Sequence, residues 1–322
     1  MDRISSDLEG GLRSSGNTDL SAIGLPDDHA ELLAHSAQRL SVPPELLALD
    51  ELDVLYDESQ EALWTFMRPV GRPSFTPTML TDFVSWQRLI TDSFGADRVP
   101  LKYLVLGSRA PGVFCFGGDL ELFQQLIRDG NRDGLAAYGY RCVEILHRNI
   151  NALDLPILTI GLVQGQALGG GFEALLSFDY IIAERGSTFG LPEVMFGLFP
   201  GMGAHAILSR KLGAAMADRV ILSNETYSAE QMHALGIVHQ LADPGQGVAA
   251  VRDFMAKSSR RHAGLVGARR ASRCANPIPL EELRDIVDHW ANSALQLREQ
   301  DLKLMQRLAS AQAKRPRAAS AA

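Results

Sequence analysis

Short apolar runs separated by polar turns fill the first half of the chain and predict part of a sheet. Residues 52–56 and 62–67 are two β-prone runs with a polar segment between them, which predicts a hairpin or meander. Apolar residues spaced by three and four predict a helix over 79–94, and residues 102–106 predict a buried strand that Gly107 ends. This order is typical of a ββα unit followed by another strand.

Helical and strand patterns continue to alternate through the middle of the chain. Apolar residues recur at spacings of three and four over 138–153 and predict an amphipathic helix that ends before Pro156. The alternation predicts an α/β fold, although no literal sequence repeat is present. The further predicted elements are strands at 157–163 and 180–183 and helices at 172–178 and 228–235, the last closed by Gly236.

The two ends of the chain differ from this middle part. Residues 1–28 are rich in Gly, Ser and Asp and lack periodicity, which predicts a flexible leader, and a short amphipathic helix is predicted over 28–40. An apolar stripe predicts one long helix over 280–308, and such a stripe needs a surface to cover it. The stripe consists of Leu283, Val287, Trp290, Ala294, Leu297, Leu304 and Leu308. We therefore predict a leader with a short helix at 1–48, a core at 49–245, a helical region for oligomerisation or as a lid at 246–311, and a disordered tail at 312–322.

Composition narrows the classes of protein. With 46% hydrophobic and 21% charged residues, the 322-residue chain is typical of a globular protein. The net charge of −7 argues against a nucleic-acid binder, because phosphate binding needs a basic field. The stretch at 257–273 is basic instead. It is either a solvated helix face or a docking surface for an acidic partner. No apolar run is long enough to span a bilayer, and the first residues have no apolar signal region, so neither membrane insertion nor export is expected.

The cysteines favour a reducing compartment. The sequence has 3 cysteines, which lie far apart with no CxxC pair and no histidine at ligand spacing. Neither a disulfide framework nor a metal site is predicted, and a cytoplasmic location fits this usage.

A glycine-rich segment carries the candidate chemistry. Gly169, Gly170 and Gly171 fall between a predicted strand and a predicted helix, where backbone N–H groups at a helix start suit an oxygen that becomes negative. Glu173 follows at the start of the helix, and Glu193 stands twenty residues later in a loop bounded by Gly and Pro. Two carboxyl groups in one confined pocket raise at least one pKa and can supply an acid and a base. Taken singly, a glycine turn or a glutamate in a first helical turn is more often structural.

Three motifs in order resemble the crotonase (enoyl-CoA hydratase/isomerase) superfamily. The chain has ALGGGFE at 167–173, FGLPEVMFGLFPGMG at 189–203 and FCFGGD at 114–119. The resemblance covers residues 50–260 and implies an α/β spiral of ββα units with a helical C-terminal region. It implies no cofactor, and it implies homotrimers or hexamers that bury the last apolar stripe.

The resemblance also assigns site residues. It implies that the backbone N–H groups of Gly118 and Gly170 form an oxyanion hole and that Glu173 and Glu193 are the catalytic carboxyls. Glu193 is expected to take the Cα proton, and Glu173 to protonate the departing oxygen. The residues expected against the substrate are Phe116, Gly117 and Gly169 at the turns, and Met195, Phe196, Met202 and Trp290 along an acyl tunnel, although plain core packing is the alternative for the tunnel residues.

Within the superfamily, the chain is similar to the diffusible signal factor synthases. The similarity rests on the 191–203 segment, on MRPVGRPSFTP at 67–77 and on the Trp-bearing C-terminal helix. It implies dehydration of a 3-hydroxyacyl group on acyl carrier protein to a cis-2-enoyl thioester, followed by thioester hydrolysis that releases a fatty-acid signal. Glu121 stands where coenzyme A-using relatives commonly have a lysine, which favours a phosphopantetheine arm over a whole nucleotide unless Glu121 faces solvent. The alternatives are an ordinary enoyl-CoA hydratase and a regulatory protein that binds a sensor protein of the signalling system.

Overall fold

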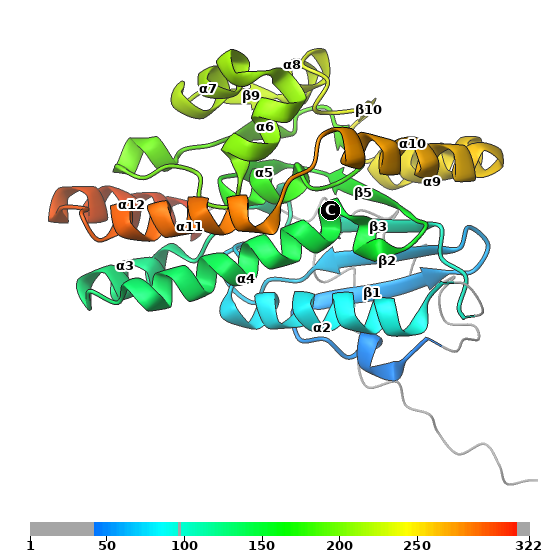
Figure 1. Cartoon of the computed structure of the whole chain (residues 1–322), viewed down its shortest axis with the longest axis horizontal. Coiled ribbons are helices and arrows are strands. Elements are labelled where there is room, and N and C mark those ends of the chain that lie inside the picture. The colour runs from blue at the N-terminus through cyan, green and yellow to red at the C-terminus, as the bar shows by residue number, and fades with distance from the viewer. Residues whose placement is uncertain (1–41, 96–97, 314–322) are drawn as a thin grey trace, which may run out of the picture.

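Two sheets with helices packed around them form the α/β fold of this chain (Figure 1). The structure is a computed structural model that describes residues 42–95 and 98–313. The predicted leader at 1–28, the predicted helix at 28–40 and residues 314–322 of the predicted tail lie outside the described residues. The end of the predicted 1–48 segment is described: a 3₁₀ turn (η2, Pro44–Leu47) carries the fully buried Leu46.

The larger sheet contains six strands in the order β1-β2-β3-β5-β7-β10. β1 and β2 form the predicted antiparallel hairpin, with Leu52 opposite Met67, and the remaining neighbours are parallel. β3 extends past its predicted end to Ser108, because Gly107 packs directly under the ring of Phe66 instead of ending the strand. The strands are β1 (Leu52–Asp57), β2 (Ala62–Met67), β3 (Tyr103–Ser108), β5 (Leu158–Val163), β7 (Tyr180–Glu184) and β10 (Gln240–Ala242).

The smaller sheet has four short strands in the order β4-β6-β8-β9. β4, β6 and β8 are parallel, and each follows directly on a strand of the larger sheet: β4 on β3, β6 on β5 and β8 on β7. The predicted spiral is therefore present, and three successive turns of the chain end at the same edge of the small sheet. The strands are β4 (Val113–Cys115), β6 (Gln166–Leu168), β8 (Thr188–Gly190) and β9 (Thr226–Ser228).

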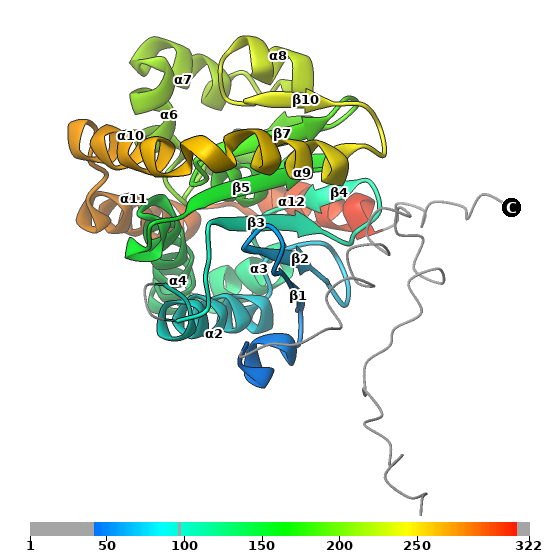
Figure 2. The same cartoon turned by 90° about the vertical axis from the view of Figure 1, so that its right-hand side faces the viewer.

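Helices cover both faces of the larger sheet because side chains alternate between its two faces. Leu104 packs on the side of α2 and α4, whereas Val105 packs on the side of α9, where it meets Val248 and Val251. Figure 2 shows α9 and α10 across this second face. These helices are α2 (Pro77–Ser93), α4 (Arg132–Ile150), α9 (Gly247–Ser258) and α10 (His262–Ala275).

Local signals explain where the other elements differ from their predicted bounds. α4 begins six residues before the predicted start because the Asn131 side chain accepts a hydrogen bond from the Gly134 N–H and caps the helix. It ends at Ile150, since Ala152 and the two residues after it have positive φ. The remaining elements are α3 (Leu120–Arg128), η3 (Ala152–Asp154), α5 (Gly170–Leu175), η4 (Glu193–Phe196), α6 (Ala204–Leu212), α7 (Ala214–Leu222), α8 (Ala229–Ala234) and η5 (Ser259–Arg261).

The prediction of one long helix over 280–308 is wrong. The chain forms α11 (Leu280–Ala294) and α12 (Glu299–Ala313), with a break where Leu297 packs on Gly197 and the Asp301 side chain accepts a hydrogen bond from the Arg298 N–H. α11 packs along α4 so closely that a Cβ at Gly139 would lie 2.5 Å from Val287, and α12 packs on α3 and η4. The apolar stripe is thus covered by its own chain and gives no reason for an oligomer. The trimer or hexamer stays a prediction.

Candidate active site

Two glycine turns meet at the edge of the small sheet, one after β4 and one after β6. Gly117 (φ +86°) and Gly169 (φ +54°) have backbone conformations that favour glycine. A Cβ at Gly117 would lie 2.5 Å from the Gly170 nitrogen, and a Cβ at Gly171 would lie 2.3 Å from the Cys115 carbonyl oxygen. Glycine is required here because the two backbones are in direct contact.

The amides of Gly118 and Gly170 are the available donors of these turns. The neighbouring amides are used: Gly117 donates to the Cys115 Sγ at 3.3 Å, and Gly169 donates to the Gly190 carbonyl at 2.8 Å. Within residues 42–95 and 98–313, no acceptor is found for the N–H of Gly118 or of Gly170. Gly170 is the first residue of α5, so its N–H also lacks a partner in the helix. Both residues line one cavity, and their N–H groups are suited to hold a carbonyl oxygen that gains negative charge.

Glu173 lies in the first turn of α5, and its side chain is almost completely buried. Its Oε1 accepts hydrogen bonds from the N–H of Met202 at 2.9 Å and of Ala204 at 3.0 Å. Burial raises the pKa of Glu173 to about 7, and the two N–H donors act in the opposite direction. Because Ala204 begins α6, the carboxyl group also caps the start of that helix.

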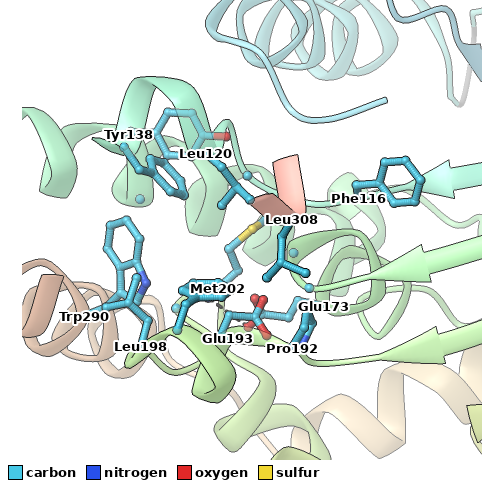
Figure 3. A pocket seen from close by; sticks show the side chains of 17 residues that line it. Phe116, Leu120, Tyr138, Glu173, Pro192, Glu193, Leu198, Met202, Trp290 and Leu308 are labelled. Atoms are coloured by element: carbon cyan, nitrogen blue, oxygen red, sulfur yellow. Dashed lines mark hydrogen bonds between the residues drawn. The ribbon is translucent and has the colours of Figure 1, made fainter. Parts of the chain in front are cut away.

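Glu193 begins η4 and approaches the same place from the other side. Its Oε1 would lie 2.5 Å from a Cβ at Gly169, and its Oε2 is buried without a hydrogen-bond partner among the described residues. Burial raises the pKa of Glu193 to about 8, and the negative charge of Glu173 contributes to the same shift. Figure 3 shows the two carboxyl groups next to each other in the cavity.

Because both pKa values are raised to near neutral pH, the pair can hold one proton between its two carboxyl groups there. The hydrogen bonds place the negative charge on Glu173, because two backbone N–H groups stabilise its ionised form. The higher pKa of Glu193, and its Oε2 without a partner among the described residues, favour the proton on that side chain. This order is the reverse of the expected roles, in which Glu193 is the base.

The cavity around the pair is small and mostly apolar, with a volume of about 60 Å³. One wall is aromatic: Phe123 lies edge-on to Tyr138 and to Trp290, with ring centroids 4.9 and 5.0 Å apart. An apolar wall weakens the hydration of the carboxyl groups and suits an acyl chain. The cavity is lined by Phe116, Gly118, Leu120, Phe123, Tyr138, Gly139, Gly169, Gly170, Glu173, Pro192, Glu193, Phe196, Leu198, Gly201, Met202, Trp290 and Leu308.

Most of the predicted site residues meet here, but two do not line the cavity. Gly117 forms the turn behind the Gly118 amide, and Met195 points away, with 48% of its surface exposed. η4 turns Phe196 inward and Met195 outward, so the structure does not place Met195 in an acyl tunnel. No sequence signal selects Phe123 or Tyr138, and Leu308 was predicted only as a residue of the apolar stripe. The predicted residues that do line the cavity are Phe116, Gly118, Gly169, Gly170, Glu173, Glu193, Phe196, Met202 and Trp290.

Two charged features expected to favour a carrier protein lie elsewhere. Glu121 is exposed in the first turn of α3 and is absent from the cavity wall. The basic stretch at 257–273 is on α9 and α10, at the opposite end of the molecule from α3 and α12 in Figure 1. Part of its charge is used internally, since Arg273 pairs with Asp179 at 2.6 Å. Neither feature lines the active-site cavity.

The part of the chain that the structure describes contains neither a candidate metal site nor a helix that could span a membrane. No group of His, Cys, Asp and Glu side chains there could hold a metal ion. No helix there has the length and apolar character needed to cross a bilayer.

Several known proteins are similar to this chain in sequence or in structure. The sequence profile described as enoyl-CoA hydratase/isomerase matches residues 62–262. Mitochondrial methylglutaconyl-CoA hydratase of Rattus norvegicus is 28% identical over 222 residues, which cover 67% of this chain and 66% of that protein. Mitochondrial enoyl-CoA hydratase domain-containing protein 2 of Bos taurus is 32% identical over 182 residues, 56% of this chain and 59% of that protein. The chain thus spans less than two thirds of the length of these curated relatives.

Among solved structures, Pseudomonas aeruginosa DspI is similar to this chain with a TM-score of 0.58 at 24% sequence identity. The match covers 75% of this chain and 91% of the DspI chain.

Proposed function

Because this chain belongs to the enoyl-CoA hydratase/isomerase family, we propose that it dehydrates a 3-hydroxyacyl thioester and then hydrolyses the thioester. The product is a cis-2-unsaturated fatty acid that serves as a quorum-sensing signal. One observation carries the chemistry: two amides without an acceptor among the described residues line the same cavity as two buried carboxyl groups with raised pKa values. The resemblance to diffusible signal factor synthases supports the choice of substrate.

Dehydration uses the pair in its resting state. The Gly118 and Gly170 amides hold the thioester carbonyl oxygen and make the Cα–H more acidic. Ionised Glu173 takes the Cα proton, and the electron pair forms the Cα–Cβ double bond as the β-hydroxyl leaves. Protonated Glu193 donates its proton to that hydroxyl, which departs as water. The pair then holds its proton on Glu173.

Thioester hydrolysis returns the proton to Glu193. Glu193, now ionised, takes a proton from a water molecule as its oxygen attacks the thioester carbon. The same two amides hold the negative oxygen of the tetrahedral intermediate, because both steps place charge on one atom. Glu173 donates its proton to the departing thiol sulfur, and the free acid is released. The two steps together restore the starting state of both carboxyl groups.

We assign the acyl carrier as the phosphopantetheine arm of acyl carrier protein, with coenzyme A as the alternative, and no resident cofactor. This assignment rests on the sequence resemblance, since Glu121 and the basic stretch do not line the cavity. A cytoplasmic location, a homotrimer or hexamer, and contact with a sensor protein complete the proposal.

The test is incubation with 3-hydroxyacyl thioesters of acyl carrier protein and of coenzyme A, followed by mass spectrometry of free acids. A free cis-2-enoic acid from the carrier-protein thioester is expected. Glu173→Gln and Glu193→Gln should each slow its formation ~10²–10⁴-fold, whereas Glu121→Gln, at an exposed position, should not. An enoyl thioester without free acid would identify an ordinary hydratase and refute the hydrolytic step.

A purely regulatory role is the second candidate, carried only by the resemblance. It makes a separate prediction: Glu173→Gln would retain binding to a sensor protein and the parent chain would turn over no thioester. Turnover by the parent that the glutamine variants lose would exclude a solely regulatory role.

A further inference from the structure

A second cavity, of about 210 Å³, shares no lining residue with the active-site cavity. It lies between the end of α4, the segment after α5, the end of α6, and α10. Its lining combines cationic, polar and apolar side chains from segments far apart in the sequence. They are Ile150, Leu176, Ser177, Phe178, Asp179, Ile207, Arg210, Lys211, Arg269, Ser272, Arg273, Asn276 and Ile278.

The lining carries more positive than negative charge. Asp179 is the one carboxylate among the lining residues, and Arg273 pairs with it at 2.6 Å. Asp179 also accepts hydrogen bonds from the backbone and hydroxyl of Thr159. Arg210 is paired outside the lining, with both oxygens of Glu282 at 2.8 Å. Two of the four cations are thus neutralised within the chain.

Lys211 and Arg269 are the other two cations of the cavity lining. Neither has a carboxylate within 4.0 Å among the residues described. Arg269 lies over the Tyr180 ring, 4.4 Å from its centroid, and its Nη2 is 3.5 Å from the Nε2 of His239. Lys211 is exposed as a residue, yet desolvation of its ammonium group lowers its pKa. The charge of Arg269 lowers that pKa further, and the charge of Asp179 acts in the opposite direction with a smaller effect. An anion between these two side chains would relieve their repulsion.

The rest of the wall is suited to a hydrocarbon chain. Leu176, Phe178 and Ile207 are buried at its base, and Ile150 and Ile278 add partly buried apolar surface. Apolar walls next to unpaired cations fit a ligand with an acidic group on an apolar chain. The geometry points to a binding site for a fatty-acid anion, with its carboxylate between Lys211 and Arg269 and its chain along this apolar wall. The site is separate from the proposed reaction, and its test needs no turnover.

Equilibrium dialysis with labelled decanoate counts the molecules bound per chain. We expect the Lys211→Gln/Arg269→Gln double variant to bind one equivalent fewer than the parent, or to bind it at least ~10-fold more weakly. Arg270→Gln is the matched control: it removes an exposed charge from the same helix outside the lining and should bind like the parent. Any binding in the active-site cavity is common to all three proteins.

Further probes separate the parts of the proposal. Ser272→Glu keeps all four cations and adds a carboxylate at an exposed lining position, so it should displace decanoate even if the double variant folds poorly. Decanol lacks the carboxylate and acetate lacks the long hydrocarbon chain, so each should compete only weakly with decanoate. Equal stoichiometry together with equal affinity in the parent, the double variant and Ser272→Glu would overturn the proposal. Competition by decanol or by acetate as strong as that of decanoate would overturn it as well.

Discussion

Like charges crowd together in the active-site cavity and in the second cavity described above, and they are relieved in different ways. In the active-site cavity, Glu173 and Glu193 have pKa values raised to about 7 and about 8, so the pair can bind a proton near neutral pH. In the second cavity, Lys211 and Arg269 have no carboxylate within 4.0 Å among the residues that the structure describes. A carboxyl pair therefore becomes an acid and a base, whereas a cation pair becomes a place for an anion.

The largest expected effect comes from removing either member of the carboxyl pair. Glu173→Gln or Glu193→Gln should each lower kcat/KM for dehydration ~10²–10⁴-fold, because each removes one proton transfer. Steady-state kinetics on the 3-hydroxyacyl thioester measure this loss. Lys211→Gln, in the second cavity, is the control and should turn over like the parent. Activity above a tenth of the parent in both glutamine variants would show that the pair does not carry the reaction.

The two carboxyl groups should also differ in the proton transfer that each one carries out. If ionised Glu173 is the base, Glu193→Gln retains exchange of the substrate Cα proton with deuterated water, and Glu173→Gln loses it. Mass spectrometry of recovered substrate gives the deuterium content. The opposite result would restore Glu193 as the base, as the sequence resemblance implies.

The amide pair should contribute almost as much as a carboxyl group. In Gly170→Ala the new Cβ would lie 2.7 Å from the Sδ of Met202 and 3.5 Å from the Gly118 nitrogen, so the two donors move apart. We expect a ~10²–10³-fold loss in kcat. Met202→Ala in the same chain should recover part of it by making room. A Gly170→Ala variant with unchanged kcat would argue against an oxyanion hole at this position.

The pH profile should reflect one shared proton. Activity requires one ionised and one protonated carboxyl group, so kcat/KM should be greatest between the two apparent pKa values, about 7 and about 8. It should fall on both sides, approaching ~10-fold per pH unit. Initial rates from pH 5 to pH 10 test this profile. A flat profile through neutrality would mean that the pair does not share a proton.

The smallest expected effects are on thermal stability, and their pH dependence should differ between the two cavities. A carboxyl pKa raised in the folded state makes folding less favourable above the ordinary value of 4.5, and the cost grows until about pH 8. Glu193→Gln should therefore raise Tm more at pH 8 than at pH 5, by roughly 2–4 °C per kcal/mol. Lys211→Gln relieves repulsion from Arg269 at both pH values, so any gain should be similar at each. Thermal unfolding at the two pH values provides the measurement, and the reverse order would contradict this account.

Elements with local signals could be predicted from the sequence, and those set by packing could not. The β1–β2 hairpin follows from two β-prone runs around a polar segment, and α2 follows from helical spacing within the segment itself. The break after Ala294 does not, because the apolar spacing continues through it. Contact of Leu297 with Gly197, a residue far away in the sequence, turns the chain there.

The same distinction applies to the site. Glu173 and Glu193 could be selected because they stand in short motifs next to glycine turns, and the spiral brings those turns to one edge. Phe123 and Tyr138 could not be selected, since the ring contacts of Phe123 with Tyr138 and with Trp290 depend on how three helices pack. Met195 and Phe196 are neighbours with opposite orientations, which apolar character alone does not distinguish.

The cap that Glu173 provides for α6 links chemistry to movement of the chain. While Glu173 is ionised, its Oε1 binds the amides of Met202 and Ala204 tightly. Once it accepts a proton, the same oxygen becomes a weaker acceptor, and the Met202 backbone is held less firmly. The wall formed by the Met202 side chain would then loosen after the first chemical step, when the shape of the acyl chain has changed, and tighten again when the acid departs.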